Sequence, residues 1–213
     1  MEKKFSEQDS LQLINEMIAQ ARDNVRKGAG DSMITAGYVV AFTAFADFLG
    51  MCWMDNTNMA HWVWSLMLPY FIVCLIRRSR RDRTLLVRTH IDKIVSWTWT
   101  AFGYTCYLVL AVIFSMVYLL HTWEIQHAWV VTLMITPILL TLMGLAQFIT
   151  AKTCRFRPFI YAAYVFWAGV IVDMALLILF ADNKLQFIVL ALCAIFGFIV
   201  PGHILNRKAT DNV

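Results

Sequence analysis

Long apolar segments separated by short polar ones make up most of this chain. Six of them approach or reach the roughly 20 mostly apolar residues that a helix needs to cross the hydrocarbon core of a bilayer. They cover residues 33–54, 61–76, 95–119, 129–149, 159–180 and 187–205. The second segment is short, and we expect its helix to continue past Ile76. The pattern predicts an all-α, polytopic membrane protein built as a bundle of six transmembrane helices.

The residues before the first apolar segment have a helical pattern of their own. Apolar side chains recur there at spacings of three or four, which places them on one helical face: Leu11, Ile14, Ile18, Ala21 and Val25. We expect Gly28 and Gly30 to end this helix ahead of the membrane. The domains are then a cytoplasmic amphipathic helix and linker at 1–31, a transmembrane domain at 32–206 and a cytoplasmic tail at 207–213. The helix either docks on a partner or a lipid surface, or is a lead-in that packs under the bundle.

Composition supports the membrane location and excludes two other classes. Hydrophobic residues make up 60% of the 213 residues, charged residues make up 15%, and the mean hydropathy is +0.64. Soluble domains carry about 25% charged residues, and disordered chains combine low hydrophobicity with high net charge. The charged stretch ahead of the first segment is unlike a signal peptide, so we expect that segment to be a permanent transmembrane helix.

The distribution of Lys and Arg predicts the orientation. Seventeen of the 18 lie in the N-terminal stretch, in the loops after the second and fourth segments, or in the C-terminal tail, and only Lys184 lies on the other side. Because Lys and Arg concentrate in cytoplasmic loops, we expect both termini in the cytoplasm, in a bacterial inner membrane. His61 falls at the outer surface, and an aromatic belt marks the outer boundary: Trp53, Trp62, Trp64, Trp123 and Trp129.

The six segments also pair into similar hairpins. Thr35 and Thr100 begin similar outward-running segments 65 positions apart, and Trp62 and Trp129 begin similar returning segments 67 positions apart. The third pair of segments matches less closely. The pattern predicts three parallel helical-hairpin repeats, which occur in some transporter folds. The alternative is that these similarities arise by chance, because membrane helices are built from few residue types.

Two carboxylates lie within the predicted spans at similar depth. Asp47 and Asp173 each lie about seven residues from the outer end of their segment, which is roughly 10 Å below the boundary at 1.5 Å per residue. A charged residue within a membrane costs about 2.5–3.5 kcal/mol on insertion scales and marks a functional site by default. No Lys or Arg lies within the spans to pair with either carboxylate. We therefore predict that the two Asp residues form a site for a proton, a cation or a small ligand.

Three further residues complete this predicted site. Thr43 lies one helical turn before Asp47, among small residues that mark helix contacts in membranes. Tyr164 and Trp167 are the pocket walls that we expect. We therefore predict that the protein is a small transporter, or a membrane protein that binds a small ligand or an ion. Two alternatives remain: each Asp is a neutral structural group, or the protein is a non-transporting membrane partner or sensor subunit that acts through its cytoplasmic face.

The outer loop after the third segment contains a weak metal pattern. His121, Glu124 and His127 would share one face if the segment were helical, and imidazole and carboxylate groups can hold a metal. The alternative is a set of ordinary polar loop residues. The sequence has no nucleophile elbow, zinc-protease motif or phosphate loop, so we predict no catalytic residue and no cofactor. A site assembled from several spans would leave no such motif, so an enzyme is not excluded.

The loop after the second segment carries the densest charge. Its basic cluster is a candidate contact for lipid headgroups or a protein partner: Arg77, Arg78, Arg80 and Arg81. Topology alone also explains these charges, because Lys and Arg accumulate on the cytoplasmic side. We predict no nucleic-acid partner.

The layout of the chain resembles that of uncharacterised six-span bacterial inner-membrane proteins. The resemblance rests on the pre-membrane helix from Leu11 to Val25, the entry from Gly28 to Gly37 and the ending Pro201-Gly202-His203. It covers most of the chain, implies the six-span topology and implies no activity or site residue. Pro201 and Gly202 are expected to kink or end the last helix near the inner boundary.

Overall fold

The computed structural model describes residues 7–54, 57–84 and 90–210, and these residues are almost entirely helical. The α-helices are α1 (Glu7–Trp53), α2 (Thr57–Ala60), α3 (Met67–Thr84), α4 (His90–Thr122), α5 (Ile135–Cys154), α6 (Arg157–Phe180), α7 (Leu185–Ala194) and α8 (Val200–Thr210). Two 3₁₀ segments, η1 (His61–Leu66) and η2 (Ala128–Met134), precede α3 and α5. A π-helical turn, η3 (Ile195–Ile199), joins α7 to α8.

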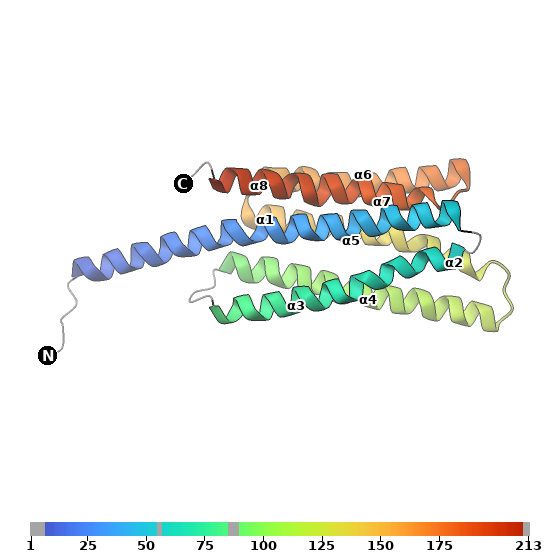
Figure 1. The fold of residues 1–213 in the computed structure, drawn as a ribbon, viewed down its shortest axis with the longest axis horizontal. Helices are drawn as coiled ribbons and strands as arrows, with labels where there is room; N and C mark the ends of the chain where they lie inside the picture. Colours follow the sequence, from blue (N-terminus) through green and yellow to red (C-terminus); the bar gives the residue numbers. More distant parts are fainter. Residues whose placement is uncertain (1–6, 55–56, 85–89, 211–213) are drawn as a thin grey trace.

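The helices lie side by side with their axes along one direction (Figure 1). One end of the bundle, which we call the terminal end, holds the start of α1, the end of α3, the start of α4, the α5–α6 turn and the end of α8. The opposite end, which we call the far end, holds the end of α1, the start of α2 and the connections from α4 to η2 and from α6 to α7. The chain therefore enters and leaves the bundle at the same end.

Within the part of the chain that the structure describes, five helices are long and apolar enough to cross a membrane, so the structure is compatible with an integral membrane protein. They are Gly30–Trp53, His90–Thr122, Val130–Cys154, Arg157–Phe180 and Leu185–Arg207, with hydropathies from 1.5 to 2.4. The remaining predicted span is the shorter apolar segment His61–Cys74. Its helix, α3, continues to Thr84, as expected from the short apolar run.

The packed core lies between α1, α5, α6 and the α7–α8 segment. Phe166 of α6 is fully buried and its ring faces Gly197 of η3, where an added methyl group would clash with it. Gly37 of α1 lies equally close to Ile199. Small residues of this kind let membrane helices approach closely. By contrast, α4 buries only Ile113 among its described side chains, so α3 and α4 form an outer layer.

The expected break at Gly28 and Gly30 is wrong, because α1 runs without interruption from Glu7 to Trp53. A glycine inside a helix costs only about 1 kcal/mol relative to alanine. At Gly30 the missing side chain serves packing, since an added Cβ would overlap the Asn206 side chain of α8 and lie 3.1 Å from the Gly202 carbonyl oxygen. The predicted apolar face from Leu11 to Val25 lies outside the residues whose side chains are described.

The last helix does not end at Pro201 but continues to Thr210. Its irregularity lies just before the proline, as the π turn η3. A proline in a helix has no N–H to donate and its ring crowds the carbonyl four residues earlier, so the preceding turn adjusts. Pro69 and Pro137 likewise follow the 3₁₀ segments η1 and η2 by three residues. Each returning segment of the bundle thus has a non-α turn on the N-terminal side of a proline.

Candidate functional site

Asp47 of α1 is the most completely enclosed acidic side chain among the described residues, with 0% of its surface exposed. His61 Nδ1 lies 3.1 Å from both carboxylate oxygens of Asp47. Trp64 donates its indole N–H to Asp47 Oδ2 at 2.6 Å. An ionised carboxylate only accepts hydrogen bonds, so when Asp47 is ionised the donor in this contact is Nδ1 of His61. We call Asp47, His61 and Trp64 the Asp47 cluster.

The 3₁₀ geometry of η1 explains why two of its residues reach the same carboxylate. A 3₁₀-helix has three residues per turn, so the side chains of His61 and Trp64 lie one above the other. Phe187 of α7 supports both rings from behind, with ring centroids 5.8 Å from His61 and 6.4 Å from Trp64. In a regular α-helix the same two side chains would diverge by about 60°, because successive residues are 100° apart.

The cluster joins a buried charge to the surface of the bundle. The His61 side chain is 44% exposed, whereas the Asp47 side chain is fully buried. Imidazole is the side chain that gains and loses a proton between about pH 5 and 8. When His61 is protonated, the contact is an ion pair, and when it is neutral, the contact is a hydrogen bond. The charge of the cluster can therefore change from the far end of the bundle without exposing Asp47.

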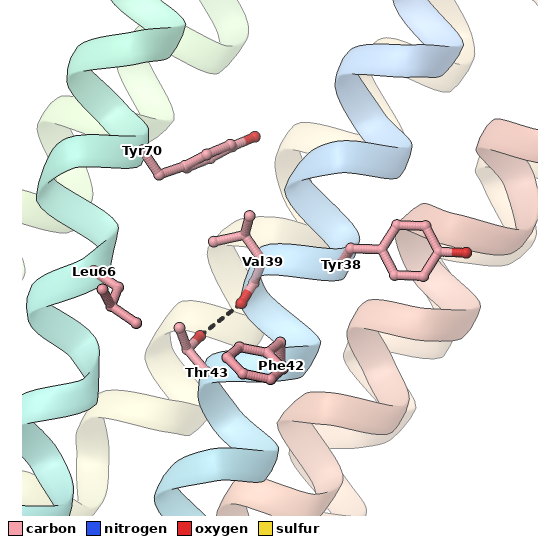
Figure 2. A pocket seen from close by; sticks show the side chains of 6 residues that line it. All are labelled: Tyr38, Val39, Phe42, Thr43, Leu66 and Tyr70. Carbon is pink, nitrogen blue, oxygen red and sulfur yellow. Dashed lines mark hydrogen bonds between the residues drawn. The ribbon is translucent and has the colours of Figure 1, made fainter.

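Thr43 lies one helical turn before Asp47 on α1 and is also buried. Its hydroxyl donates within α1, to the carbonyl oxygen of Val39 at 2.8 Å and to that of Val40 at 3.1 Å. Thr43 also lines an open groove between α1 and the η1–α3 segment, with a volume of about 460 Å³ (Figure 2). The groove walls are Tyr38, Val39, Phe42, Thr43, Leu66 and Tyr70.

Asp173 of α6 is buried as expected, but it does not share a site with Asp47. Both α1 and α6 pack against α7, which lies between them. No hydrogen bond or electrostatic interaction joins Asp173 to Asp47 among the described residues. Asp173 lies one turn from Gly169, whose Cα packs against the Cys193 thiol of α7. Its role in binding a ligand stays a prediction.

The two aromatic residues predicted as pocket walls lie at the contact between α5 and α6. Trp167 donates its indole N–H to the carbonyl oxygen of Thr141 at 3.3 Å and packs on Gly144. Tyr164 contacts Trp167 edge to face, with ring centroids 5.9 Å apart. Their contacts are thus with α5 and with each other, rather than with the Asp47 cluster.

The other predicted residues lie at the two ends of the bundle. His121 lies in the last turn of α4, while Glu124 and His127 follow the helix with left-handed backbone angles, so the helical arc that would have aligned them is absent. Among the described residues, no group of three potential metal-ligating side chains converges. Arg77 and Arg80 are exposed in the second half of α3, and the side chains of Arg78 and Arg81 lie outside the described part.

Sequence reasoning missed the partners of Asp47. His61 and Trp64 were assigned to the outer surface and the aromatic belt, because hydropathy places them at a boundary. Their spacing of three residues, opposite the only acidic residue of the preceding span, was the available signal. That signal requires knowing that the segment is a 3₁₀-helix.

A second buried polar contact lies near the other end of the core. Gln147 of α5 is fully buried, and its Nε2 lies 3.5 Å from the carbonyl oxygen of Gly197. Gly197 is four residues before Pro201, which has no N–H to give to that oxygen. Gln147 Oε1 has no hydrogen-bond partner. The amide of Gln147 therefore donates to a carbonyl that the proline leaves short of a donor.

Comparison with protein-family models, with curated proteins and with solved structures gave no match.

Proposed function

We propose that this chain is a six-span membrane protein that binds a proton at the Asp47–His61 pair and couples that binding to the movement or recognition of a small ligand or ion. The observation that carries the proposal is the pairing of a fully buried carboxylate with a half-exposed imidazole. A buried charge is costly unless it is paired and hydrogen-bonded. The pair therefore gives the bundle a group whose charge changes within the physiological pH range.

The donors around Asp47 favour a proton over a metal cation. Both contacts to the carboxylate come from nitrogen atoms that carry hydrogen, His61 Nδ1–H and Trp64 Nε1–H. These N–H groups occupy the carboxylate oxygens and repel a metal ion at the same position. A proton that enters from solvent instead binds the other ring nitrogen of His61 and makes the imidazole positive beside Asp47.

The pair also connects parts of the bundle that are otherwise loosely joined. It links α1 to η1, while α3 beyond η1 makes few backbone contacts with α1 or α4. Loss of the pair removes the main polar attachment between α1 and the η1–α3 segment. Protonation of His61 thus favours one arrangement of this segment, as a coupled transporter or a sensor requires.

The proposed orientation places the terminal end in the cytoplasm of a bacterial inner membrane. It is supported by the concentration of Lys and Arg in the segments at the terminal end, because such residues concentrate on the cytoplasmic side. The Asp47 cluster then faces the outside. The three non-α turns before Pro69, Pro137 and Pro201 support the proposal of three parallel hairpin repeats. The resemblance to six-span inner-membrane proteins supports the proposed six-span topology alone.

The alternative function is a partner or sensor subunit without transport. The observation in its favour is that α1 extends past the other helices at the terminal end (Figure 1). Such an extension offers a surface for another protein. Removal of residues 1–27 would then release a co-purifying partner while the pH response of the bundle stays intact.

The test is the thermal stability of the purified protein in detergent between pH 5.5 and 8.5, with and without Na⁺, for wild type, Asp47→Asn, His61→Gln and Asp173→Asn. Because the folded state favours the protonated imidazole beside Asp47, wild-type stability should rise as the pH falls through the titration of His61. In His61→Gln the imidazole is lost and Asp47 alone can bind the proton, so any slope that remains should vanish in the Asp47→Asn, His61→Gln double variant. Asp47→Asn alone should lose the slope, and Asp173→Asn should retain it.

Two results would oppose the proposal. A slope that persists in both His61→Gln and Asp47→Asn would place the titrating group elsewhere. A Na⁺-dependent rise in stability that Asp47→Asn removes would identify Asp47 as a cation ligand instead of a proton site.

A further inference from the structure

The face of α3 that lines the groove between α1 and α3 continues beyond the groove to an arginine. Figure 2 shows Leu66 and Tyr70 reaching toward α1, with Val39 and Thr43 facing them. Tyr70, Cys74 and Arg77 follow at spacings of four and three on α3, which places them on one helical face. The Tyr70 side chain interacts with Cys74 and lies within electrostatic range of Arg77. The groove wall on α3 is therefore apolar or aromatic near its middle and cationic at the terminal end.

The length of this wall matches one leaflet of a bilayer. Leu66 and Arg77 are eleven residues apart, which corresponds to roughly 16 Å along a helix. Half of the hydrocarbon core of a bilayer is about 15 Å thick. When Arg77 lies at the headgroup level, Leu66 lies close to the midplane. A chain that fills the groove from Arg77 to Leu66 is therefore as long as one acyl chain in that leaflet.

We propose that this groove is a binding site for one phospholipid with an anionic headgroup. One acyl chain lies between Leu66 and Tyr70 on one side and Val39 and Phe42 on the other, and the phosphate contacts Arg77. The volume of about 460 Å³ falls within the range of small-molecule sites, about 300–1,000 Å³. Exposed aromatic rings line the opening, and Arg77 is exposed to accept the headgroup. The charge of Arg77 distinguishes this site from the large apolar side chains that are exposed elsewhere on the bundle.

The lipid site and the proton-binding function have separate readouts. Proton binding is measured by the pH dependence of stability, whereas lipid binding is measured by the phospholipid that the protein retains. Either proposal can fail while the other holds, because Leu66→Trp and Arg77→Gln test the groove with Asp47 and His61 both present.

The test is native mass spectrometry of the full chain after delipidation in detergent and addition of phosphatidylglycerol or phosphatidylcholine. The wild type should retain one phosphatidylglycerol per chain in preference to phosphatidylcholine. Leu66→Trp fills the groove and should lower retention at least threefold. Arg77→Gln should remove the preference for the anionic lipid without abolishing retention of either lipid. Tyr70→Leu opens the groove wall and should also weaken lipid retention. This variant replaces Leu66→Trp in the test if Leu66→Trp does not fold.

Matched controls lie on the same helix outside the groove. Leu68 is 57% exposed and lies on the opposite side of α3 from Tyr70, so Leu68→Trp adds the same bulk to the lipid-facing surface. Arg80→Gln removes the same charge from a position turned by about 80° relative to Tyr70. Both variants should retain phosphatidylglycerol as the wild type does.

Three results would overturn the proposal. Equal retention in wild type, Leu66→Trp and Arg77→Gln would show that the groove holds no lipid. Equal losses in Leu68→Trp and Arg80→Gln would show annular lipid held by general charge. Retention of a second protein chain that Leu66→Trp releases, with no bound lipid, would assign the groove to a partner helix.

Discussion

Trp64 donates its indole N–H to Oδ2 of Asp47 at 2.6 Å, although the two residues are 17 positions apart and lie in different helical segments. This contact, with that of His61, holds η1 against α1 at the far end of the bundle. Trp64, which the sequence places in the aromatic belt, is therefore a hydrogen-bond donor to the buried carboxylate. The stability of the cluster can therefore be tested by removing one N–H at a time.

Substitution of Trp64 by Phe should destabilise the fold through the lost hydrogen bond. The ring would still pack on Phe187, but Asp47 would lose one of its two donors. A hydrogen bond to a charged group contributes about 1.5–3 kcal/mol, so a loss in this range is expected in denaturant or thermal unfolding. Trp62→Phe is the matched control, because Trp62 is 75% exposed. Equal effects of the two variants would contradict the assigned contact.

Gln147 should stabilise the fold because Pro201 provides no backbone N–H to the Gly197 carbonyl oxygen. Gln147→Met keeps the shape of the side chain but removes the donor that faces the Gly197 carbonyl oxygen. A loss of about 1–2 kcal/mol is expected in the wild type, since a buried acceptor is left without that donor. In a Pro201→Ala background the backbone regains an N–H, and the loss caused by Gln147→Met should shrink. A double-mutant cycle of unfolding free energies measures this coupling. Strictly additive effects would show that the two residues do not share the carbonyl.

Gly37 should tolerate no side chain. A Cβ at this position would lie 2.7 Å from Ile199 Cγ1 and 2.9 Å from Phe198 Cβ, so Gly37→Ala forces α1 away from η3. Overpacking of this kind costs about 1–3 kcal/mol. At Gly103 the nearest atom is Phe71 Cε2 at 3.8 Å, so Gly103→Ala should be neutral or stabilising by about 0.5–1 kcal/mol. Thermal unfolding of the two variants in detergent provides the comparison. Equal melting temperatures would contradict the close approach at Gly37.

The proposed orientation predicts which cysteine a membrane-impermeant maleimide reaches. Cys52 is exposed at the far end and Cys154 lies at the terminal end. In intact bacterial cells with a permeable outer membrane, a variant with Cys52 as its only cysteine should be labelled. A variant with Cys154 as its only cysteine should be labelled only after the inner membrane is disrupted. The reverse pattern would invert the topology and place the Asp47 cluster in the cytoplasm.

The positions of the helices could be predicted from the sequence, because transmembrane length and hydropathy are local properties. The turns before Pro69, Pro137 and Pro201 could not, since the type of adjustment depends on what packs beside the proline. The continuity of α1 through Gly30 was missed for the same reason. From the sequence alone Gly30 is expected to break the helix, because its close contact with Gly202 and Asn206 is visible only in the structure.

For the candidate site, the burial of Asp47 was predictable but its partners were not. An acidic residue in an apolar span must face the interior, and it does. The order of helices around the bundle cannot be obtained from hydropathy, so equal depth suggested Asp173 as the partner. The structure places α7 between the two helices and supplies His61 and Trp64 from the neighbouring segment instead.

The most direct test of the Asp47–His61 pair is infrared difference spectroscopy of the purified protein near neutral pH, which detects the C=O stretch of a protonated carboxylic acid. If Asp47 is ionised because His61 carries the proton, Asp47 contributes no acid band to the wild-type spectrum. Asp47→Asn should then remove no acid band. His61→Gln should create such a band, since a buried carboxylate without a cationic partner binds a proton itself. The band should vanish again in the Asp47→Asn, His61→Gln double variant. Identical spectra for wild type and His61→Gln would contradict the proposal that the two residues share a titratable proton.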